Sequence, residues 1–444
     1  MQGDPREVAV RILTERGDAS RGSYLQGLGD PRDRALVQEL VSGTRKQRGL
    51  IDRHLAAFSS RPTGQLPARL LNALRVGVFQ LLFTGIPAYA AVSSTVGCLS
   101  RRGERAFANG VLRAAASSLG HVDMPSLDED PVGYAAARYS YPRWIIALFI
   151  RRFGLTGALS TCFLGNEPPP LALRVNSLLA SRDQYLGMLG EAGHSAEPGA
   201  MGASVRVRGG GDVTKLPGFA EGLFVVQDEG ATAIGEAVAP LPGDKVWDVC
   251  AAPGGKTTHL SELMEGQGEV LATDVDDSRV KMVNESVGRL RLENVSAQVM
   301  DATKPDWSRR FNRILVDAPC SGLGVLRRNP DLRWNRRLSD IPRMVSRQAA
   351  LLESAAGCLL PGGTLVYSTC TLTEEENEGV WTAFLGKHPG LEPDDPARGS
   401  GADAAAAKLG LYAGPPFAGP GYRYILPHLS GTDGFFVARA AKRG

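Results

Sequence analysis

Two cysteines follow short apolar runs that have the composition of buried strands. The segment ILVDAPCSGLG (314–324) ends its apolar run at Asp317 and reaches Cys320 three residues later, and TLVYSTCTLTEEENE (364–378) leads to Cys370. Functional groups of open α/β sheets lie beyond the carboxyl ends of strands, where ligands bind. A thiol at that edge can form a covalent intermediate once its pKa has been lowered. An aspartate beside it can hold or share a proton at the reacting group.

A third strand exit, KVWDVCAAPGGKTTHL (245–260), has the composition of a ligand-binding turn. Its glycines let the backbone approach a ligand closely, and the helix that follows points its first amides toward that ligand. The cofactor-binding positions expected in this turn are Cys250, Ala251, Ala252, Pro253, Gly254, Gly255 and Lys256. We expect the Cys250 side chain to pack, and Lys256 to hold either a cofactor carboxylate or only the loop.

Acidic residues end the neighbouring predicted strands. Asp274 follows the first glycine of the turn by twenty residues, a place that suits ribose hydroxyls. Asp301 ends the third strand, where an adenine ring would lie, and Asp317 ends the fourth. Arg279 can pair with Asp274 or face a ligand. A crevice lined by carboxylates suits S-adenosylmethionine, whose sulfonium is cationic and which has free ribose hydroxyls and no phosphate.

Two other nucleotide-binding patterns compete with this interpretation. CAAPGGKT (250–257) differs from the P-loop pattern GxxxxGK[ST] only in having Cys250 in place of the first glycine. Pro253 has no N–H to donate to a phosphate, and the aspartates would repel a triphosphate. The GxGxxG pattern of NAD-binding domains is missing from this turn. A P-loop nucleotidase is therefore kept only as an alternative.

Strands alternate with helices from about residue 240, which predicts a doubly wound, Rossmann-like sheet. The predicted strands are 245–250, 269–274, 296–301, 313–318, 364–370 and 434–441. Upstream, the strands LALRVN, SVRVRG and GLFVVQDEGA and a helix after Ser181 predict a small α+β subdomain. Residues 121–165 are interpreted as a linker that contains one amphipathic helix. Segment 390–422, rich in Gly, Ala and Pro, predicts an irregular surface insertion.

Apolar residues at helical spacing predict a helical domain over residues 5–120. Residues 1–125 carry 17 Lys and Arg, 16 of them Arg, against 10 Asp and Glu, whereas the rest of the chain carries 33 against 37. Arginine suits phosphates and bases, so this domain either binds nucleic acid or has a solvated basic surface. The predicted domains are 1–125, 126–235 and 236–444.

Cysteine usage and hydropathy indicate the compartment. The six cysteines form no CxxC pair and no zinc-ligand spacing, so we expect reduced thiols, no metal and a cytoplasmic location. The first residues contain no apolar signal segment, and the run WIIALFI (144–150) is too short to cross a bilayer. We expect a monomer with no membrane partner.

Three blocks carry a resemblance to a known family. DVCAAPGGKTTHL (248–260), DAPCSGLGVLRRNPDLRW (317–334) and YSTCT (367–371), in this order, resemble the Sun/NOL1/NOP2 family of RNA cytosine-C5 methyltransferases. ERAFANGVLRAA (104–115) resembles the last helix of the NusB fold. The resemblance implies an all-α RNA-binding NusB-like domain in front of a class I methyltransferase domain. It also implies S-adenosylmethionine as cofactor and small-subunit (16S) ribosomal RNA as substrate, with the cytosine conventionally numbered 967 as target.

The chemistry of this family requires a cysteine, because C5 of cytosine is a poor nucleophile. A thiolate adds to C6, C5 attacks the methyl group, a base removes the C5 proton and the thiolate leaves. The resemblance implies that Cys370 is the nucleophile and that Cys320 assists product release. Many DNA cytosine methyltransferases instead use a cysteine that follows a proline as the nucleophile, and that pattern would favour Cys320 for this role. Asp317 is placed to contact N3. A non-catalytic RNA-binding assembly factor is a further alternative, against which these three residues argue.

The remaining charged or reactive side chains are assigned to RNA contact, to a helix start or to packing. LRRNPDLRWNRR (326–337) predicts RNA backbone contact, with Trp334 stacking or anchoring, or else a solvated basic helix start. The acidic run EEENE (374–378) predicts a helix N-terminus. Packing roles are expected for His259, Cys98, Cys162 and Cys358.

Overall fold

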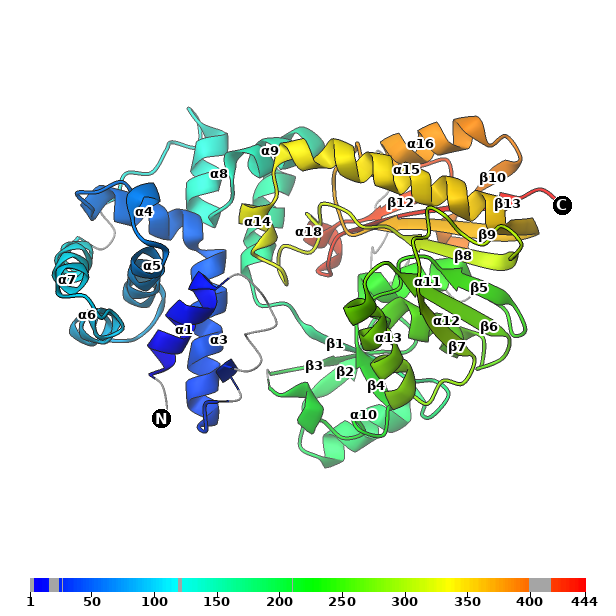
Figure 1. The fold of residues 1–444 in the computed structure, drawn as a ribbon, viewed down its shortest axis with the longest axis horizontal. Helices are drawn as coiled ribbons and strands as arrows, with labels where there is room; N and C mark the ends of the chain where they lie inside the picture. The colour runs from blue at the N-terminus through cyan, green and yellow to red at the C-terminus, as the bar shows by residue number, and fades with distance from the viewer. Residues whose placement is uncertain (1–3, 16–23, 26, 119–121, 210, 399–416) are drawn as a thin grey trace. The chain divides into compact units, whose positions relative to one another are not determined.

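The chain divides into two compact units, residues 1–166 and 167–444 (Figure 1). The computed structural model describes residues 4–15, 24–25, 27–118, 122–209, 211–398 and 417–444. Each unit has a buried apolar core of its own, and each is described by itself.

The described part of the first unit is helical. Its α-helices are α1 (Pro5–Thr14), α3 (Pro31–Lys46), α4 (Arg48–Phe58), α5 (Ala68–Phe83), α6 (Ala88–Gly97), α7 (Arg102–Ser117), α8 (Pro131–Tyr139) and α9 (Arg143–Asn166). Asp4 and Asp30 cap α1 and α3 by accepting from backbone N–H groups, and each is followed by a proline at the first helical position. The predicted all-α N-terminal domain is confirmed.

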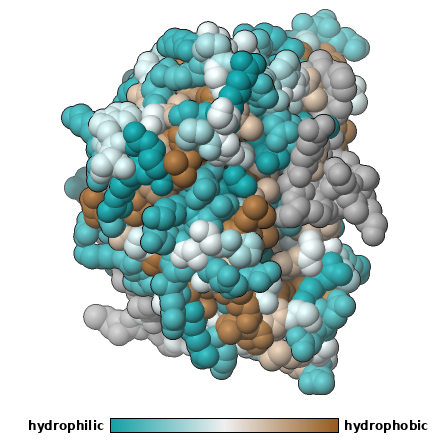
Figure 2. Space-filling model, turned by 90° about the vertical axis from the view of Figure 1, so that its right-hand side faces the viewer, coloured by the Kyte–Doolittle hydropathy of each residue, from teal (hydrophilic) through white to brown (hydrophobic). Residues whose placement is uncertain are grey.

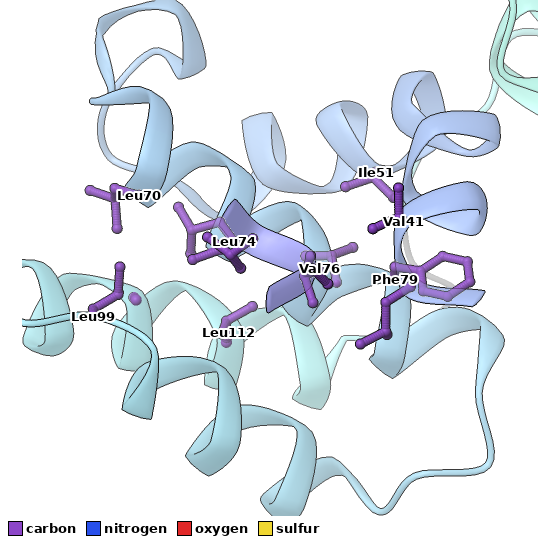
Figure 3. Packing of buried hydrophobic residues seen from close by; sticks show 14 of the residues in the cluster. Val41, Ile51, Leu70, Leu74, Val76, Phe79, Leu99 and Leu112 are labelled. Carbon is purple, nitrogen blue, oxygen red and sulfur yellow. The ribbon is translucent and has the colours of Figure 1, made fainter. Parts of the chain in front are cut away.

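Helix α5 forms the centre of this first core. Leu70, Leu74, Val76 and Phe79 are buried on it and pack with residues of the surrounding helices (Figure 3). Gly77 allows α7 to approach, because a Cβ at this position would lie 2.7 Å from Leu112. The amphipathic pattern therefore buries a continuous apolar surface, as a helical bundle requires.

Helices α8 and α9 occupy most of the segment predicted as a linker. The first part of α9 confirms the helix predicted for residues 139–154, whereas α8 and the part of α9 beyond Gly154 were not predicted. Among the described helices, α9 alone has the length and hydropathy of a membrane span. Gly154 interrupts it with φ 69° and ψ 174°, so that two shorter helices meet there. The break leaves each half well below the roughly 20 residues that a span needs.

The second unit begins with a small antiparallel sheet. Its strand order is β2 (Ala196–Pro198), β3 (Ser204–Val207), β1 (Leu171–Val175) and β4 (Phe224–Val226), and α10 (Arg182–Glu191) covers it. Ser181 and Gln184 form a capping box at the start of α10. The predicted α+β subdomain is confirmed, and β2 is an additional strand.

A larger mixed sheet forms the rest of the second unit. Its strand order is β11 (Ala418–Gly419), β12 (Tyr422–Ile425), β13 (Phe435–Lys442), β9 (Leu359–Thr369), β8 (Phe311–Asp317), β5 (Lys245–Asp248), β6 (Glu269–Asp274) and β7 (Val295–Val299). Strands β7, β6, β5, β8 and β9 are parallel, whereas β13 pairs with β9 in the antiparallel sense. The predicted Rossmann-like sheet is confirmed, with an antiparallel edge added.

Helices cover both faces of this sheet (Figure 1). On one face lie α11 (Glu229–Val238), α12 (Gly255–Leu263) and α13 (Asp277–Arg289), and on the other lie α15 (Ile341–Cys358) and α16 (Glu378–Lys387). The chain runs outward from β5 to β7 and then returns to β8 on the other side of β5. The switch point of the sheet is therefore between β5 and β8, where such folds bind ligands.

Two local predictions differ in part from the structure of this unit. Residues 391–394 of the segment predicted as irregular form strand β10 (Leu391–Asp394), which pairs with β13. Residues 399–416 of that segment lie outside the described residues. The acidic run 374–378 lies at a helix start, as predicted, but only Glu378 belongs to α16, because residues 374–377 form turns. On the face shown in Figure 2 the coloured residues are mostly hydrophilic, and hydrophobic ones form small separate patches.

A buried arginine joins the small sheet to the large one. Arg174 of β1 is fully buried and donates to Gln227, to the Gly255 carbonyl oxygen at 3.3 Å and to Thr258 Oγ1 at 2.8 Å. It also forms an ion pair with the buried Glu262 of α12. The small subdomain is thus bonded to the helix that follows the predicted cofactor turn.

Replacing Arg174 by alanine should strongly destabilise the second unit, because Glu262 would keep a buried charge without its partner. Removing one partner of a buried pair typically costs about 3–5 kcal/mol. Urea unfolding followed by circular dichroism measures this free energy. As a control, Arg208→Ala, at the residue directly after β3, removes an exposed ion pair with Glu197 and should change stability little. If both variants lowered the free energy of unfolding by the same amount, the buried Arg174–Glu262 pair would stabilise the unit no more than an exposed ion pair does.

Candidate active site

The carboxyl ends of the parallel strands bring the predicted site residues to one edge of the large sheet. Asp274 ends β6, Asp317 ends β8, and Cys370 directly follows β9. The predicted cofactor turn leaves β5 at the centre of this edge. Residues that are up to 120 positions apart in the sequence thus converge beside the switch point.

The cofactor turn has the conformation that its glycines predict. Gly254 has φ 101°, in the left-handed region, and its N–H donates to the Ala251 carbonyl oxygen at 2.8 Å. Helix α12 begins at the next residue, so its first amides face the same edge. Burial raises the pKa of Cys250, which therefore holds a neutral thiol at neutral pH, as a packing role requires.

Asp274 and Arg279 form a pair beside the turn. The Asp274 side chain is 4% exposed and lies 3.4 Å from Arg279. Arg279 also donates to the Ala252 carbonyl oxygen at 3.1 Å. Of the two sequence interpretations, the pairing with Asp274 is found. The arginine joins the second strand exit to the cofactor turn and holds the carboxylate in place.

Asp301 lies two residues beyond β7 and is exposed. Thr303 donates to its Oδ1 through its hydroxyl at 2.7 Å and through its N–H at 3.1 Å. These hydrogen bonds lower the pKa of Asp301, so its carboxylate is ionised. Its role beside an adenine ring stays a prediction.

Lys256 and Asp317 form an ion pair at the switch point. The Lys256 ammonium lies 2.7 Å from Asp317 Oδ2, and the Ser368 hydroxyl donates to Asp317 Oδ1 at 2.7 Å. Burial is the largest single effect and lowers the pKa of Lys256, but the charge and the hydrogen bond of Asp317, together with smaller effects of Cys370 and Asp248, outweigh it, so the pKa lies above its ordinary value. Lys256 therefore has a protein partner that the sequence did not predict. Ser368 was also missed, although it lies two residues before Cys370.

The two cysteines lie side by side at the ends of β8 and β9. The distance between Cys320 Sγ and Cys370 Sγ is 3.3 Å. Gly324 donates to the Cys370 carbonyl oxygen at 2.9 Å and so joins the two loops. The hydrogen bond to Cys370, together with burial, raises the pKa of Cys320 well above its ordinary value. Cys320 therefore lacks the lowered pKa that an attacking thiol requires, and either sulfur can be the donor in the hydrogen bond between the two cysteines.

The basic stretch 326–337 is bonded to the protein. Arg327 donates to three backbone carbonyl oxygens, and Arg328 forms ion pairs with Asp228 and Asp433. Arg333 is fully buried. The prediction of RNA contact is therefore wrong for Arg333, and Arg327 and Arg328 have structural partners instead. Sequence patterning could not show this, because the partners lie more than 90 residues away.

Comparisons with known proteins cover nearly the whole chain. The family model described as 16S rRNA methyltransferase RsmB/F matches residues 236–441, and the NusB family model matches residues 4–117. A model of the RsmF/B-like ferredoxin-like domain matches residues 141–214. These matches agree with the helical unit, the small sheet and the large sheet.

Curated relatives and solved structures agree with the family models. Ribosomal RNA small subunit methyltransferase B of Pseudomonas putida is 36% identical over 99% of this chain and 100% of its own length. The protein of that name from Serratia proteamaculans is 36% identical over 93% of this chain and 91% of its own length. The crystal structure of PH0851 is 27% identical, with a TM-score of 0.81 over 100% of both chains. NSun6 from Pyrococcus horikoshii, solved with the S-adenosylmethionine analogue SFG, is 25% identical over 69% of this chain and 99% of its own, with a TM-score of 0.60.

Proposed function

Because the chain belongs to the RsmB/F family of S-adenosylmethionine-dependent rRNA methyltransferases, we propose that it methylates C5 of a cytosine in small-subunit rRNA. We further propose the cytosine conventionally numbered 967 as the target. The observation that carries the C5 chemistry is the 3.3 Å distance between the Cys320 and Cys370 sulfur atoms, beside Asp317. Methylation of a ring nitrogen or of a ribose hydroxyl requires no thiol, whereas methylation at C5 requires a temporary bond at C6.

The residues of the cofactor turn fit S-adenosylmethionine. Asp274 offers a nearly buried carboxylate that can accept from ribose hydroxyls, and the turn from Cys250 to Lys256 allows close approach at Gly254. Asp301 is proposed to lie by the adenine ring. When bound, the cofactor supplies an electrophilic methyl group on a cationic sulfur, which suits an edge lined by Asp274 and Asp317.

The protein's own residues account for the steps at cytosine. Cys370 Sγ bonds to C6 while Asp317, which shares a proton with the Lys256 ammonium, donates a hydrogen bond to N3. The electron pair thus released to C5 would form the bond to the methyl group, and the electron pair of the broken methyl–sulfur bond would stay with the cofactor sulfur. A base then takes the C5 proton, the C5=C6 double bond re-forms and the C6–sulfur bond breaks. Cys320, held protonated beside Cys370, donates a hydrogen bond to the departing sulfur.

The target cytosine must leave its stack to reach the sheet edge, since both faces of the large sheet are covered by helices. We propose naked or partly assembled rRNA as substrate, bound by a monomer in the cytoplasm, with the NusB-like domain and the small subdomain adding RNA contacts. Domain limits at 1–125, 126–235 and 236–444 are kept as predictions. The family assignment displaces the P-loop nucleotidase, and the paired cysteines favour an enzyme over a non-catalytic assembly factor.

A product analysis tests this function. Naked 16S rRNA is incubated with the enzyme and S-adenosylmethionine carrying a labelled methyl group, and the RNA is then digested to nucleosides. We expect the label in 5-methylcytidine, at the single cytosine numbered 967, and none in 23S rRNA used as a control. Label in another nucleoside would overturn the C5 chemistry, and label at another cytosine would overturn only the target position.

A further inference from the structure

A fully buried glutamate, Glu376, is hydrogen-bonded to residues that follow the two cysteines in the chain. Glu376 has no solvent-exposed surface, although it belongs to the acidic run that the sequence placed at a helix start. It lies six residues after Cys370, in the turn that precedes α16. Burying a carboxylate costs several kcal/mol unless hydrogen bonds replace its water, so its contacts must be extensive.

Both oxygens of the Glu376 carboxylate accept hydrogen bonds. Its Oε1 accepts from the Ser321 N–H at 2.8 Å and from Gln348 Nε2 at 3.1 Å. Its Oε2 accepts from the Ser321 hydroxyl at 2.5 Å and from the Thr373 hydroxyl at 2.8 Å. The carboxylate therefore joins the loop of Cys370, through Thr373, to the residue that follows Cys320.

The same network holds the backbone on both sides of Cys320. Gln348 of α15 donates to the Pro319 carbonyl oxygen at 3.0 Å as well as to Glu376. Pro319 and Ser321 are the two chain neighbours of Cys320, so its backbone is fixed from both directions. The Ser321 hydroxyl is also 2.6 Å from the hydroxyl of Thr371, the residue after Cys370.

The main chain of the glutamate is itself anchored. Tyr367 of β9 is fully buried and donates its hydroxyl to the Glu376 carbonyl oxygen at 2.6 Å. The Tyr367 ring stacks on Trp381 of α16, with ring centroids 6.4 Å apart. The main chain of Glu376 is thus bonded to β9, which Cys370 directly follows, and its carboxylate reaches the loop that carries Cys320.

We propose that Glu376 is a positioning residue that sets Cys320 against Cys370 and thereby controls release of the covalent RNA adduct. The inference rests on the proposed function, in which Cys320 assists departure of the Cys370 sulfur. A displacement of about 1 Å in a catalytic group can cost roughly 100-fold in rate. Loss of the Glu376 bonds to Ser321 should therefore slow release while leaving attack by Cys370, which directly follows β9, largely intact.

Glu376→Gln tests this role with a side chain of nearly the same size, and Glu375→Gln is the matched control at the neighbouring, exposed position. Enzyme, labelled S-adenosylmethionine and rRNA are mixed, and methyl transfer in the first turnover and decay of denaturant-resistant protein–RNA adduct are timed separately. We expect Glu376→Gln to complete the first methyl transfer within a few-fold of the wild-type rate but to release RNA roughly 10- to 100-fold more slowly. Glu375→Gln should match the wild type in both steps.

Release at the wild-type rate from folded Glu376→Gln would overturn the inference, as would equal slowing of first transfer and release. If that variant does not fold, Ser321→Ala decides, because it removes the hydroxyl bond to Glu376 and keeps the backbone bond; it too should accumulate adduct. A wild-type enzyme that never forms a cysteine–RNA adduct would instead overturn the proposed covalent chemistry itself, a distinct result obtained without any Glu376 variant.

Discussion

Cys370→Ala is expected to abolish methyl transfer, lowering turnover by roughly 10⁴-fold or more while S-adenosylmethionine still binds. The sulfur supplies the bond to C6 without which C5 does not attack the methyl group, and removal of a covalent nucleophile typically has effects of this size. Cys370 lies outside the cofactor turn, which is formed between β5 and α12. Turnover is measured as methyl groups transferred to rRNA, and cofactor binding by calorimetry.

Cys358→Ala is the matched control for this prediction. Cys358 is a fully buried thiol at the end of α15, in the same unit, and the structure confirms the packing role predicted for it. Its removal should cost some stability and leave the activity of the folded enzyme close to wild type. If Cys370→Ala kept turnover within tenfold of the wild type, the nucleophile would lie elsewhere.

Cys320→Ala is expected to trap the enzyme on its product. With Cys370 present, the methyl group is transferred once per enzyme molecule, but the departing sulfur no longer has a hydrogen-bond donor 3.3 Å away. Stabilisation of a leaving group by a positioned proton donor typically contributes roughly 10²–10⁴-fold. The expected result is a burst of about one methyl group per enzyme, together with a protein–RNA adduct that survives denaturing electrophoresis.

The double variant Cys320→Ala/Cys370→Ala should form no such adduct, which shows that the trapped bond is to Cys370. Normal turnover by Cys320→Ala, with no adduct, would remove Cys320 from product release. The network around Glu376 would then hold a loop with no function in that step.

Those parts of the fold that depend on local patterning could be predicted from the sequence. Strand β6 (Glu269–Asp274) has the predicted limits, because a short apolar run between a glycine turn and an aspartate fits few structures other than a buried strand. Gly254 has the positive φ expected of a ligand turn. Strand β2 was missed, since three residues ending in Pro198 resemble a turn more than a strand.

The predictions that failed concern polar residues whose partners are distant in the sequence. Glu376 is part of an exposed-looking acidic run, and its buried position depends on Ser321, 55 residues away. Arg328 resembles an RNA-binding residue until its partner Asp433 is known. The residue type tells how much free energy it costs to bury such a group, but only the fold shows which of these groups have partners.

The most direct test of the covalent mechanism uses rRNA in which cytosine is replaced by 5-fluorocytosine. The fluorine at C5 cannot be removed as a proton, so the reaction must stop after methyl transfer with the sulfur still bonded to C6. Protease digestion and mass spectrometry then identify the cysteine that carries the nucleotide. We predict a stable adduct, dependent on S-adenosylmethionine, on the peptide that contains Cys370; attachment at Cys320, or no adduct at all, would contradict the mechanism.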